Sequence, residues 1–496
     1  MGIPSYYKKL IDRHKGLVSK KKEQMPAALY YDFNCLVYQC LRDKALPSYD
    51  GTVEWEDRLL DVVCKYVRHV WTEAGQPPHV FIAVDGVVPM AKIRQQRQRR
   101  FKSVWLAEEE ARCGARTGLR WDTNAITPGT AFMDRLATRL RGLCDKYGWA
   151  LSDSHEPGEG EQKIMARIRA APPPGQTIVY GLDGDLIILS LLHSSSAPWL
   201  LMREAGEFGM AGARPEEFIY LNISELKTII SQKTDITNYI CAMSLMGNDF
   251  VPHSLSVKLR DGGHDILLAA LSGAGPLVVD GVLQWEEFRK MWVAWAVEEE
   301  SWIAEGFAHK YKMRAGPPKN DYDRAMIDTT NLPIVWRAED EIWHQSGLRP
   351  SWKAGYGRWC FNAAPDRMCD EYKRGLQWIW DYYTGKPVDM TWYYPWLLPP
   401  LWSDLSQKVC VAGALEVESR RGDVPIAEQE QLAMVLPLKS WDLLRDQGLR
   451  AVPARAPAFW PKSFGFFSAG RRWFWECEAL IPILSVRRLR AVRGRL

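Results

Sequence analysis

The sequence lacks the features that mark zinc-binding, secreted and membrane-spanning proteins. Its ten cysteines are scattered singly and none forms a CxxC pair, which argues against a zinc ribbon or a disulfide scaffold. The N-terminal segment has no apolar core of a signal peptide, and the apolar run WLLPPLW (396–402) is far shorter than the ~18 residues that span a bilayer. We therefore expect an intracellular protein with reduced thiols and no membrane contact, in the cytoplasm, with the nucleus left open.

A strong excess of one charge is also missing. Lys and Arg number 64 and Asp and Glu 60, so a formal net charge of +4 does not by itself predict a polyanionic partner. Any binding of nucleic acid would need positive charge concentrated locally. The 496 residues are 47% hydrophobic and 25% charged, which is ordinary globular usage and excludes a mostly disordered chain.

The first half of the chain alternates apolar strand-like runs with helical stretches, the pattern of an α/β domain on a largely parallel sheet. The predicted strands are 28–34, 79–86 and 177–185, and the predicted helices are 54–74, 90–112, 130–147 and 160–170. We place this domain at 1–256.

Residues 257–496 have a different texture, because tryptophan becomes dense there. We expect an irregular, mostly helical region over 257–350, a helix at 366–384, a loop at 452–461 and a basic tail at 486–496. This Trp-rich part is interpreted as a second region packed against the first.

Seven carboxylates stand at the ends of the predicted strands or in Gly-rich turns. They are Asp32, Asp85, Glu159, Glu161, Asp183, Asp185 and Asp249. Ligands gather at the carboxyl ends of parallel strands, and clusters of oxygen ligands suit hard cations such as Mg²⁺ or Mn²⁺. Two such ions ~4 Å apart would stabilise the attacking and leaving oxygens of a phosphodiester displacement. The alternative is that each aspartate only forms a turn or caps a helix.

A basic helix is predicted directly after Asp85. Lys92, Gln96, Arg99 and Arg100 are spaced i, i+4, i+7 and i+8, which places them within about 100° of one helical face. Arginine forks and a lysine match phosphate oxygens, and a compact pocket of this kind favours a terminal phosphate. The alternative is a solvated face or a patch of the nuclear-localisation type.

These segments resemble the Xrn family of 5′→3′ exoribonucleases. The blocks occur in the order that the family has: MGIPSYYKKL, YYDFN, VDGVVPMAKIRQQRQRRF, NAITPGTAFM, HEPGEGEQKI, YGLDGDLI, GNDFVPH, LQWIWDYYTG and WYYPW. The resemblance implies an α/β nuclease core of the PIN/flap-endonuclease type, with a mainly helical second conserved region that completes the active-site pocket. It also implies a minimal catalytic core that lacks the C-terminal modules of the large cytoplasmic members.

The resemblance assigns roles to all of these residues. The seven carboxylates are implied to be catalytic ligands of two divalent ions, and Lys92, Gln96, Arg99 and Arg100 to bind the 5′-monophosphate of single-stranded RNA. The implied products are nucleoside monophosphates. Trp392 is implied to stack on the leading bases together with Tyr38, which stands where the family usually has a histidine. No protein partner is inferred.

Two other functions stay open. IVYGLDGDL gives a strand followed by DxD, as in phosphatases of the haloacid-dehalogenase type, although Ile187 stands where a Thr or Val is usual and the basic helix is left unexplained. The Trp-rich second half would also suit a catalytically weak RNA-binding or scaffold protein that keeps the fold.

Overall fold

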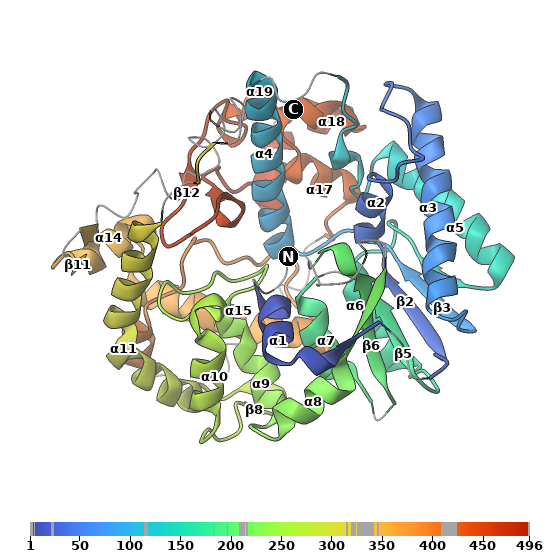
Figure 1. Ribbon diagram of the computed structural model, residues 1–496. Coiled ribbons are helices and arrows are strands. Elements are labelled where there is room, and N and C mark those ends of the chain that lie inside the picture. The colour runs from blue at the N-terminus through green and yellow to red at the C-terminus, as the bar shows by residue number, and fades with distance from the viewer. Residues whose placement is uncertain are drawn as a thin grey trace.

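One seven-stranded sheet forms the centre of the N-terminal half in the computed structural model (Figure 1). The structure describes residues 3, 5–20, 24–113, 118–181, 183–195, 197–207, 214, 217–313, 316–318, 324, 342–344, 347–407 and 424–494. The strand order is β1-β7-β6-β5-β2-β3-β4. Their bounds are β1 Val18–Ser19, β2 Ala28–Asp32, β3 His79–Ala83, β4 Ala150–Ser152, β5 Thr177–Tyr180, β6 Trp199–Glu204 and β7 Phe218–Asn222.

The strands from β2 to β6 are parallel to their neighbours, and β7 and β1 add an antiparallel edge. The chain passes from β2 to β3 on one side and returns at β5 on the other side of β2. The strand order therefore reverses beside β2, and in open α/β sheets such a point is where ligands bind.

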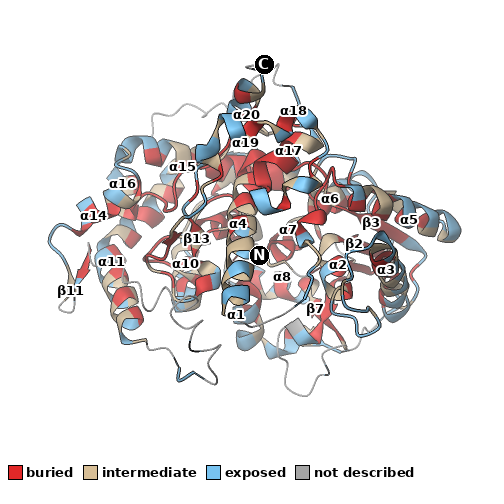
Figure 2. Cartoon of the chain, turned by 90° about the horizontal axis from the view of Figure 1, so that it is seen from above, coloured by how far each residue is buried: buried red, intermediate tan, exposed pale blue. Residues whose placement is uncertain are grey.

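Both faces of the sheet are covered by helices, because alternate side chains of the buried strands enter different hydrophobic clusters. Leu29 and Tyr31 of β2 pack in the cluster that holds residues of α3 (Val53–Glu73) and α5 (Ala131–Tyr147). Tyr30 packs in the cluster that holds residues of α6 (Gly160–Ala170) and α7 (Asp185–His193). Figure 2 shows that the outer faces of α3 and α5 stay exposed.

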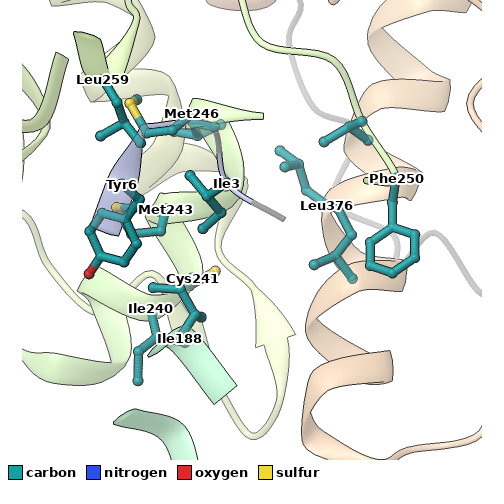
Figure 3. Close-up of a cluster of buried hydrophobic side chains, with 14 of the residues drawn as sticks. Ile3, Tyr6, Ile188, Ile240, Cys241, Met243, Met246, Phe250, Leu259 and Leu376 are labelled. Carbon is teal, nitrogen blue, oxygen red and sulfur yellow. The ribbon is translucent and has the colours of Figure 1, made fainter. Parts of the chain in front are cut away.

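The N-terminal segment shares a core with both halves of the chain. Figure 3 shows Ile3, which precedes α1 (Tyr6–Arg13), and Tyr6 on the same side of the cluster as Ile240 of α9 (Ile236–Ala242), with Leu376 of α15 (Pro365–Thr384) on the opposite side. All four belong to one hydrophobic cluster. Side chains from both sides of the predicted boundary at 256/257 are thus packed together, and the division into two domains stays a prediction.

The second region is mainly helical, as expected, although residues 325–341 of the predicted stretch 257–350 lie outside the described residues. Most of its tryptophans are core residues: Trp292, Trp378 and Trp402 are fully buried. Buried Glu299 of α11 (Trp285–Lys312) accepts hydrogen bonds from the backbone N–H groups of Trp402 (2.7 Å) and Ser403 (3.1 Å), which satisfies the start of α16 (Trp402–Gln407). The other helices and hairpin strands are α2 Asn34–Cys40, α8 Ile223–Ser231, α10 Gly263–Leu271, α11 Trp285–Lys312, α14 Trp352–Trp359, α16 Trp402–Gln407, β8 Val278–Val279, β9 Val282–Leu283, β10 Trp343–His344, β11 Gly347–Leu348, β12 Phe466–Phe467 and β13 Glu478–Ala479.

Helix α4 (Met90–Arg112) is fixed by the C-terminal part of the chain, which lies alongside it in Figure 1. The Arg97 guanidinium is buried and donates to the carbonyl oxygens of Met434 (2.7 Å), Pro482 (3.3 Å) and Phe459. Burial lowers the pKa of Arg97 to about 9. The charge at Arg97 is therefore used to hold α4 in place and does not face solvent.

Two expectations for the C-terminal part are wrong. The stretch 452–461 contains α19 (Val452–Arg455) and a 3₁₀ turn at Pro457–Phe459 where a loop was expected. The expected basic tail forms α20 (Val486–Arg493), and only its last two residues lie outside the described part of the chain. Val486, Leu489 and Val492 recur every three residues and are buried, so apolar spacing fixes this helix despite its arginines. It packs with α17 (Glu428–Val435) and α18 (Gln447–Arg450).

The remaining predicted elements are confirmed with small shifts at their ends. Helices predicted at 90–112 and 160–170 have those bounds, and the other three begin or end within one residue of the prediction. The strands are shorter than predicted. Strand β2 ends at Asp32, whereas β3 ends before Asp85 and β5 ends before Asp183. None of the helices among the described residues has both the length and the apolarity needed to cross a membrane.

Candidate active site

A pocket of about 400 Å³ opens at the carboxyl ends of β2, β3 and β5. Asp32 is the last residue of β2, Asp85 follows β3 by two residues and Asp183 follows β5 by three. Ten of the thirteen predicted site residues line this pocket: Asp32, Asp85, Glu159, Glu161, Asp183, Tyr38, Lys92, Gln96, Arg99 and Arg100. Asp185, Asp249 and Trp392 do not line it.

Gly160 lets two of the acids reach the strand ends. Its backbone N–H donates to Asp85 Oδ1 (2.7 Å), and a Cβ at this position would lie 2.8 Å from the Ala83 carbonyl oxygen and 2.8 Å from Asp32 Oδ1. No side chain fits there without a shift of backbone. The close approach of the 160 backbone places Glu159 and Glu161, on either side, at the wall of the pocket.

Lys92 bridges two of the predicted metal ligands. Its Nζ lies 2.5 Å from Glu159 Oε2 and 2.8 Å from Asp249 Oδ2. Burial opposes the charged form, but Asp249 and Glu159 outweigh it and raise the pKa of Lys92 well above its ordinary value. Gln95 Nε2 donates to the other oxygen of Asp249 (3.0 Å). Lys92 was expected to bind phosphate, and in this structure its ammonium is engaged by carboxylates.

Other acids of the set are buried with few hydrogen-bond donors or positive charges to stabilise their ionised form. Both carboxylate oxygens of Asp185 and the Oε1 of Glu161 are buried and have no hydrogen-bond partner among the described residues. Burial and the Asp183 charge raise the pKa of Asp185 to about 7. Burial and the Asp185 charge raise the pKa of Glu161 well above its usual range, and burial with Asp85 does the same for Asp32. Asp183 behaves oppositely: although burial would raise its pKa, nearby positive charges, including Lys92 and Arg99, lower it.

The acids fit a divalent cation by donor type and by their unsatisfied buried oxygens. Ionised carboxylates are acceptors only, and so many of them in a buried site need cations between them. Over the described part of the chain, however, no three such side chains are arranged around a point where an ion could be held. The identity of the ligands therefore stays a prediction.

The basic wall of the pocket comes from one face of α4. Arg100 Nη1 donates to Asn124 Oδ1 (2.8 Å), and burial lowers the pKa of Arg100. The Gln96 Oε1 is buried without a hydrogen-bond partner among the described residues, while Arg99 is exposed. Tyr38 of α2 stands at the same pocket and is 43% exposed. The helical spacing thus brought all four residues of the predicted phosphate site to one pocket.

Residues from the second region that sequence reasoning missed also reach the acids. The Tyr382 hydroxyl of α15 donates to Glu159 Oε1 (2.9 Å) across 223 positions of the chain. Asn124, in the first region, was also missed, and it fixes Arg100 on the basic wall. Both lie inside blocks that carried the resemblance, NAITPGTAFM and LQWIWDYYTG, which was the available signal.

Trp392 lies apart from the pocket and is 7% exposed. Its ring centroid is 5.2 Å from that of Trp378, and its Nε1 donates to Glu371 Oε2 (3.3 Å). In this structure its indole is a core side chain, and base stacking by Trp392 stays a prediction.

Two family models match the chain. The model described as "XRN 5'-3' exonuclease N-terminus" matches residues 1–205, and the model described as "Xrn1 helical domain" matches residues 361–494. The chain belongs to the Xrn family. Together with the sheet, this membership confirms the predicted fold class as an α/β exonuclease core followed by a mainly helical region.

Similar curated proteins support the assignment of the chain to the Xrn family. The chain is 27% identical to "5'-3' exoribonuclease 1" of Homo sapiens over 99% of this chain and 34% of the relative. It is 30% identical to "5'-3' exoribonuclease 2" of Eremothecium gossypii over 68% of this chain and 45% of the relative, and 31% identical to that of Saccharomyces cerevisiae over 54% and 35%. The chain spans less than half the length of each. Among solved structures, "The catalytic core of Rad2 in complex with DNA substrate" aligns with a TM-score of 0.34 and 12% identity over 65% of this chain and 85% of that one.

Proposed function

We propose that this member of the Xrn family is a 5′→3′ exoribonuclease that degrades single-stranded RNA with a 5′-monophosphate to nucleoside monophosphates. The observation that supports it is the pocket of about 400 Å³, which is lined by five acids from the strand ends and the start of α6 and by Gln96, Arg99 and Arg100 of α4. A site built this way can hold a terminal phosphate on one wall while the next phosphodiester lies at the other.

We propose that the seven carboxylates hold Mg²⁺ or Mn²⁺, with two ions as the expected number. When bound, the ions would supply Lewis-acid stabilisation of the phosphoryl oxygens and lower the pKa of a bound water. The residues of the chain do the rest. Arg99 and Arg100 pair with the terminal phosphate, Asn124 orients Arg100, and Tyr382 fixes the Glu159 carboxylate.

The 5′-end preference follows from charge. A 5′-monophosphate carries nearly two negative charges near neutral pH, whereas a 5′-hydroxyl would leave the arginine side chains of the pocket unpaired. A triphosphate or a cap adds bulk that a compact pocket does not admit.

The test compares one RNA with a 5′-monophosphate, a 5′-hydroxyl or a 5′-triphosphate, each with Mg²⁺ and with chelator. We expect mononucleotides from the monophosphate form only, and only with the metal. Asp183→Ala should lower turnover by orders of magnitude and leave RNA binding intact. Release of orthophosphate from a small ester, or RNA binding without degradation, would refute the proposal.

Arg99→Ala tests the phosphate site, with Arg58→Ala on the exposed face of α3 as the matched control. The Arg99 variant should shrink the advantage of monophosphate over hydroxyl RNA, and the Arg58 variant should keep it. Equal loss on both substrates would show that Arg99 contacts the RNA backbone without selecting its end.

The aromatic clamp of Tyr38 and Trp392 is part of the same proposal. Loss of one stacked base costs ~1–3 kcal/mol, so Trp392→Ala should slow digestion of structured RNA more than digestion of short unstructured oligomers. Equal slowing on both would assign Trp392 to the core alone.

The domains 1–256 and 257–496 and a cytoplasmic location are proposed on the same basis.

A further inference from the structure

A second cavity, of about 230 Å³, lies on another face of α4. At about 100° per residue, Lys92, Gln96, Arg100 and Ser103 of the first pocket occupy one side of the helix. Arg94, Gln98 and Lys102, which line the second cavity, fall on roughly the opposite side. Arg99 falls between the two rows and lines both cavities.

The rest of the second cavity comes from two segments far along the chain. The segment 247–253 contributes Asp249, the acid that Lys92 binds, and 471–478 contributes Arg471 and Trp475. The cavity is therefore adjacent to the proposed metal site through Asp249 and to the proposed phosphate site through Arg99. Nothing in the proposed chemistry uses it.

The lining of this cavity is positive after its acids are accounted for. Glu478 is paired with Arg471 (3.0 Å), Asp249 is paired with Lys92 from outside the cavity, and Glu476 is paired with Arg260, which also lies outside. The charges of Arg94, Arg99 and Lys102 remain. Burial lowers the pKa of Lys102 to about 8, which keeps it mostly protonated at neutral pH.

Several donors in the lining have no acceptor. The Nε of Arg94, the Nε of Arg471 and the Nδ2 of Asn248 are buried and have no hydrogen-bond partner among the described residues. The Oε1 of Gln95, an acceptor in the same lining, is also buried without a partner among the described residues. Donors still prevail, and because buried donors are normally satisfied they favour an anionic or oxygen-rich ligand. Beside them, Trp475 stands at the cavity with 48% of its surface exposed; the Arg260 guanidinium lies 5.8 Å from the centroid of its ring, so a base would stack on the face opposite Arg260.

We propose that this cavity binds one nucleotide, separately from the 5′-phosphate pocket, with the base against Trp475 and the phosphate near Arg94 and Lys102, which line only this cavity. Guanidinium forks and an indole face are the groups that recognise a phosphate and a base. The proposal rests on the proposed function, because an exoribonuclease releases a nucleotide beside this cavity at every turnover. The occupant is either that released nucleoside 5′-monophosphate or a nucleotide of the RNA strand.

The first arm of the test measures binding of radiolabelled AMP to the whole chain by equilibrium dialysis in chelator. Trp475→Ala should weaken this binding about 5- to 150-fold, the loss of one stacked base. The matched control is Trp473→Ala, which removes an indole that is 45% exposed two residues away and does not line the cavity. Lys102 bonds to the backbone carbonyl of Trp475 (2.8 Å), which the substitution keeps.

A third variant, Arg100→Ala, separates the two pockets, because Arg100 lines only the first. AMP binding that survives Arg100→Ala and is weakened by Trp475→Ala supports the proposal. AMP binding that is lost in the Arg100 variant and kept in the Trp475 variant assigns AMP to the 5′-phosphate pocket and overturns the proposal for the free nucleotide.

The second arm identifies the source of the nucleotide. If the site holds released product, inhibition of RNA digestion by AMP should weaken in the Trp475 variant while KM for RNA stays unchanged. If it holds a nucleotide of the strand, KM for RNA should rise in this variant and stay unchanged in the Trp473 variant. No change in AMP binding, AMP inhibition or KM overturns the proposal. Absence of RNA digestion in the parent chain would instead refute the proposed function, and dialysis would still report on the cavity.

Discussion

Removing the charge of Asp185 should change how the metal-free protein responds to pH. The folded protein holds the pKa of this carboxyl at about 7, against an ordinary value of 3.8, because the side chain is buried and faces Asp183. The folded state therefore binds this proton more tightly than the unfolded state. The contribution to stability is fully present below pH 4 and is lost as pH rises through 7.

The size of the effect follows from the same two pKa values. Between pH 5 and pH 8, the folding free energy that this group contributes falls by about 2.5 kcal/mol at ~1.4 kcal/mol per pH unit. An unfolding entropy of about 2.1 cal/mol/K per residue converts this to a shift of about 2–3 °C in Tm for a chain of this length. Full burial of Asp185 means that solvent screening does not reduce it.

The assay is thermal unfolding of the parent chain and of Asp185→Asn at pH 5 and pH 8, first in chelator. Buried histidines act in the opposite direction, since burial lowers the pKa of His193 and of His264 to about 4. Both proteins share these histidines, so the difference in Tm between them reports Asp185 together with its effect on the neighbouring Glu161. The variant should gain about 2–3 °C on the parent chain as pH rises from 5 to 8.

Addition of Mg²⁺ or Mn²⁺ completes the experiment. A bound cation stabilises the ionised form of Asp185, so the metal should raise the Tm of the parent chain more at pH 8 than at pH 5, and more than it raises that of the variant. A Tm difference that does not change with pH in chelator would refute the reasoning on Asp185. A parent chain that gains no stability from either metal at pH 8 would refute the proposed ligand set.

Three further outcomes are expected. Arg97→Met leaves the buried Met434 carbonyl oxygen, and the less buried ones of Phe459 and Pro482, without this donor. It should cost ~1–3 kcal/mol, visible as a lower Tm, whereas Arg58→Met on the surface should leave Tm unchanged. Gly160→Ala should lower turnover at least about tenfold in a single-turnover assay, because the added Cβ would lie 2.8 Å from a backbone oxygen and from a carboxylate oxygen. The control Gly142→Ala, whose Cβ would have no neighbouring atom within 4 Å, should leave turnover unchanged. Tyr382→Phe removes a hydrogen bond to the buried Glu159 carboxylate, worth ~1.5–3 kcal/mol. It should raise the Mg²⁺ concentration needed for half-maximal turnover without changing RNA affinity. An unchanged metal requirement would contradict a role of Tyr382 in positioning Glu159.

Local patterns were enough to predict the sheet core and the floor of the site. Buried parallel strands are continuous apolar runs, so β2, β3 and β5 were visible in the sequence, and the aspartates that follow them had to share one edge. Helical spacing alone also grouped the basic residues of α4, because a helix of 23 residues has a fixed angular step.

Contacts between distant segments could not be predicted in the same way. Nothing near Lys92 in the sequence indicates that Asp249 and Glu159 will meet its ammonium, and nothing near Glu159 indicates Tyr382. The segment that forms α20 was predicted to be a basic tail because of its arginines. It is a helix because its apolar residues recur every three positions and are buried. Charge is easy to see in a sequence, but burial decides the structure.

Helix α4 bears on different neighbours along three of its sides: the carboxylate pocket, the second cavity and the carbonyl groups that hold Arg97. Its register is consequently shared by all three. One residue inserted after Met90 would turn every later side chain by about 100°, move Arg97 out of its carbonyl cage and turn both rows of side chains away from the cavities that they line. Length changes are tolerable only beyond the last contact, near Arg112, so this helix is a segment whose length should vary least when the chain is altered by insertion or deletion.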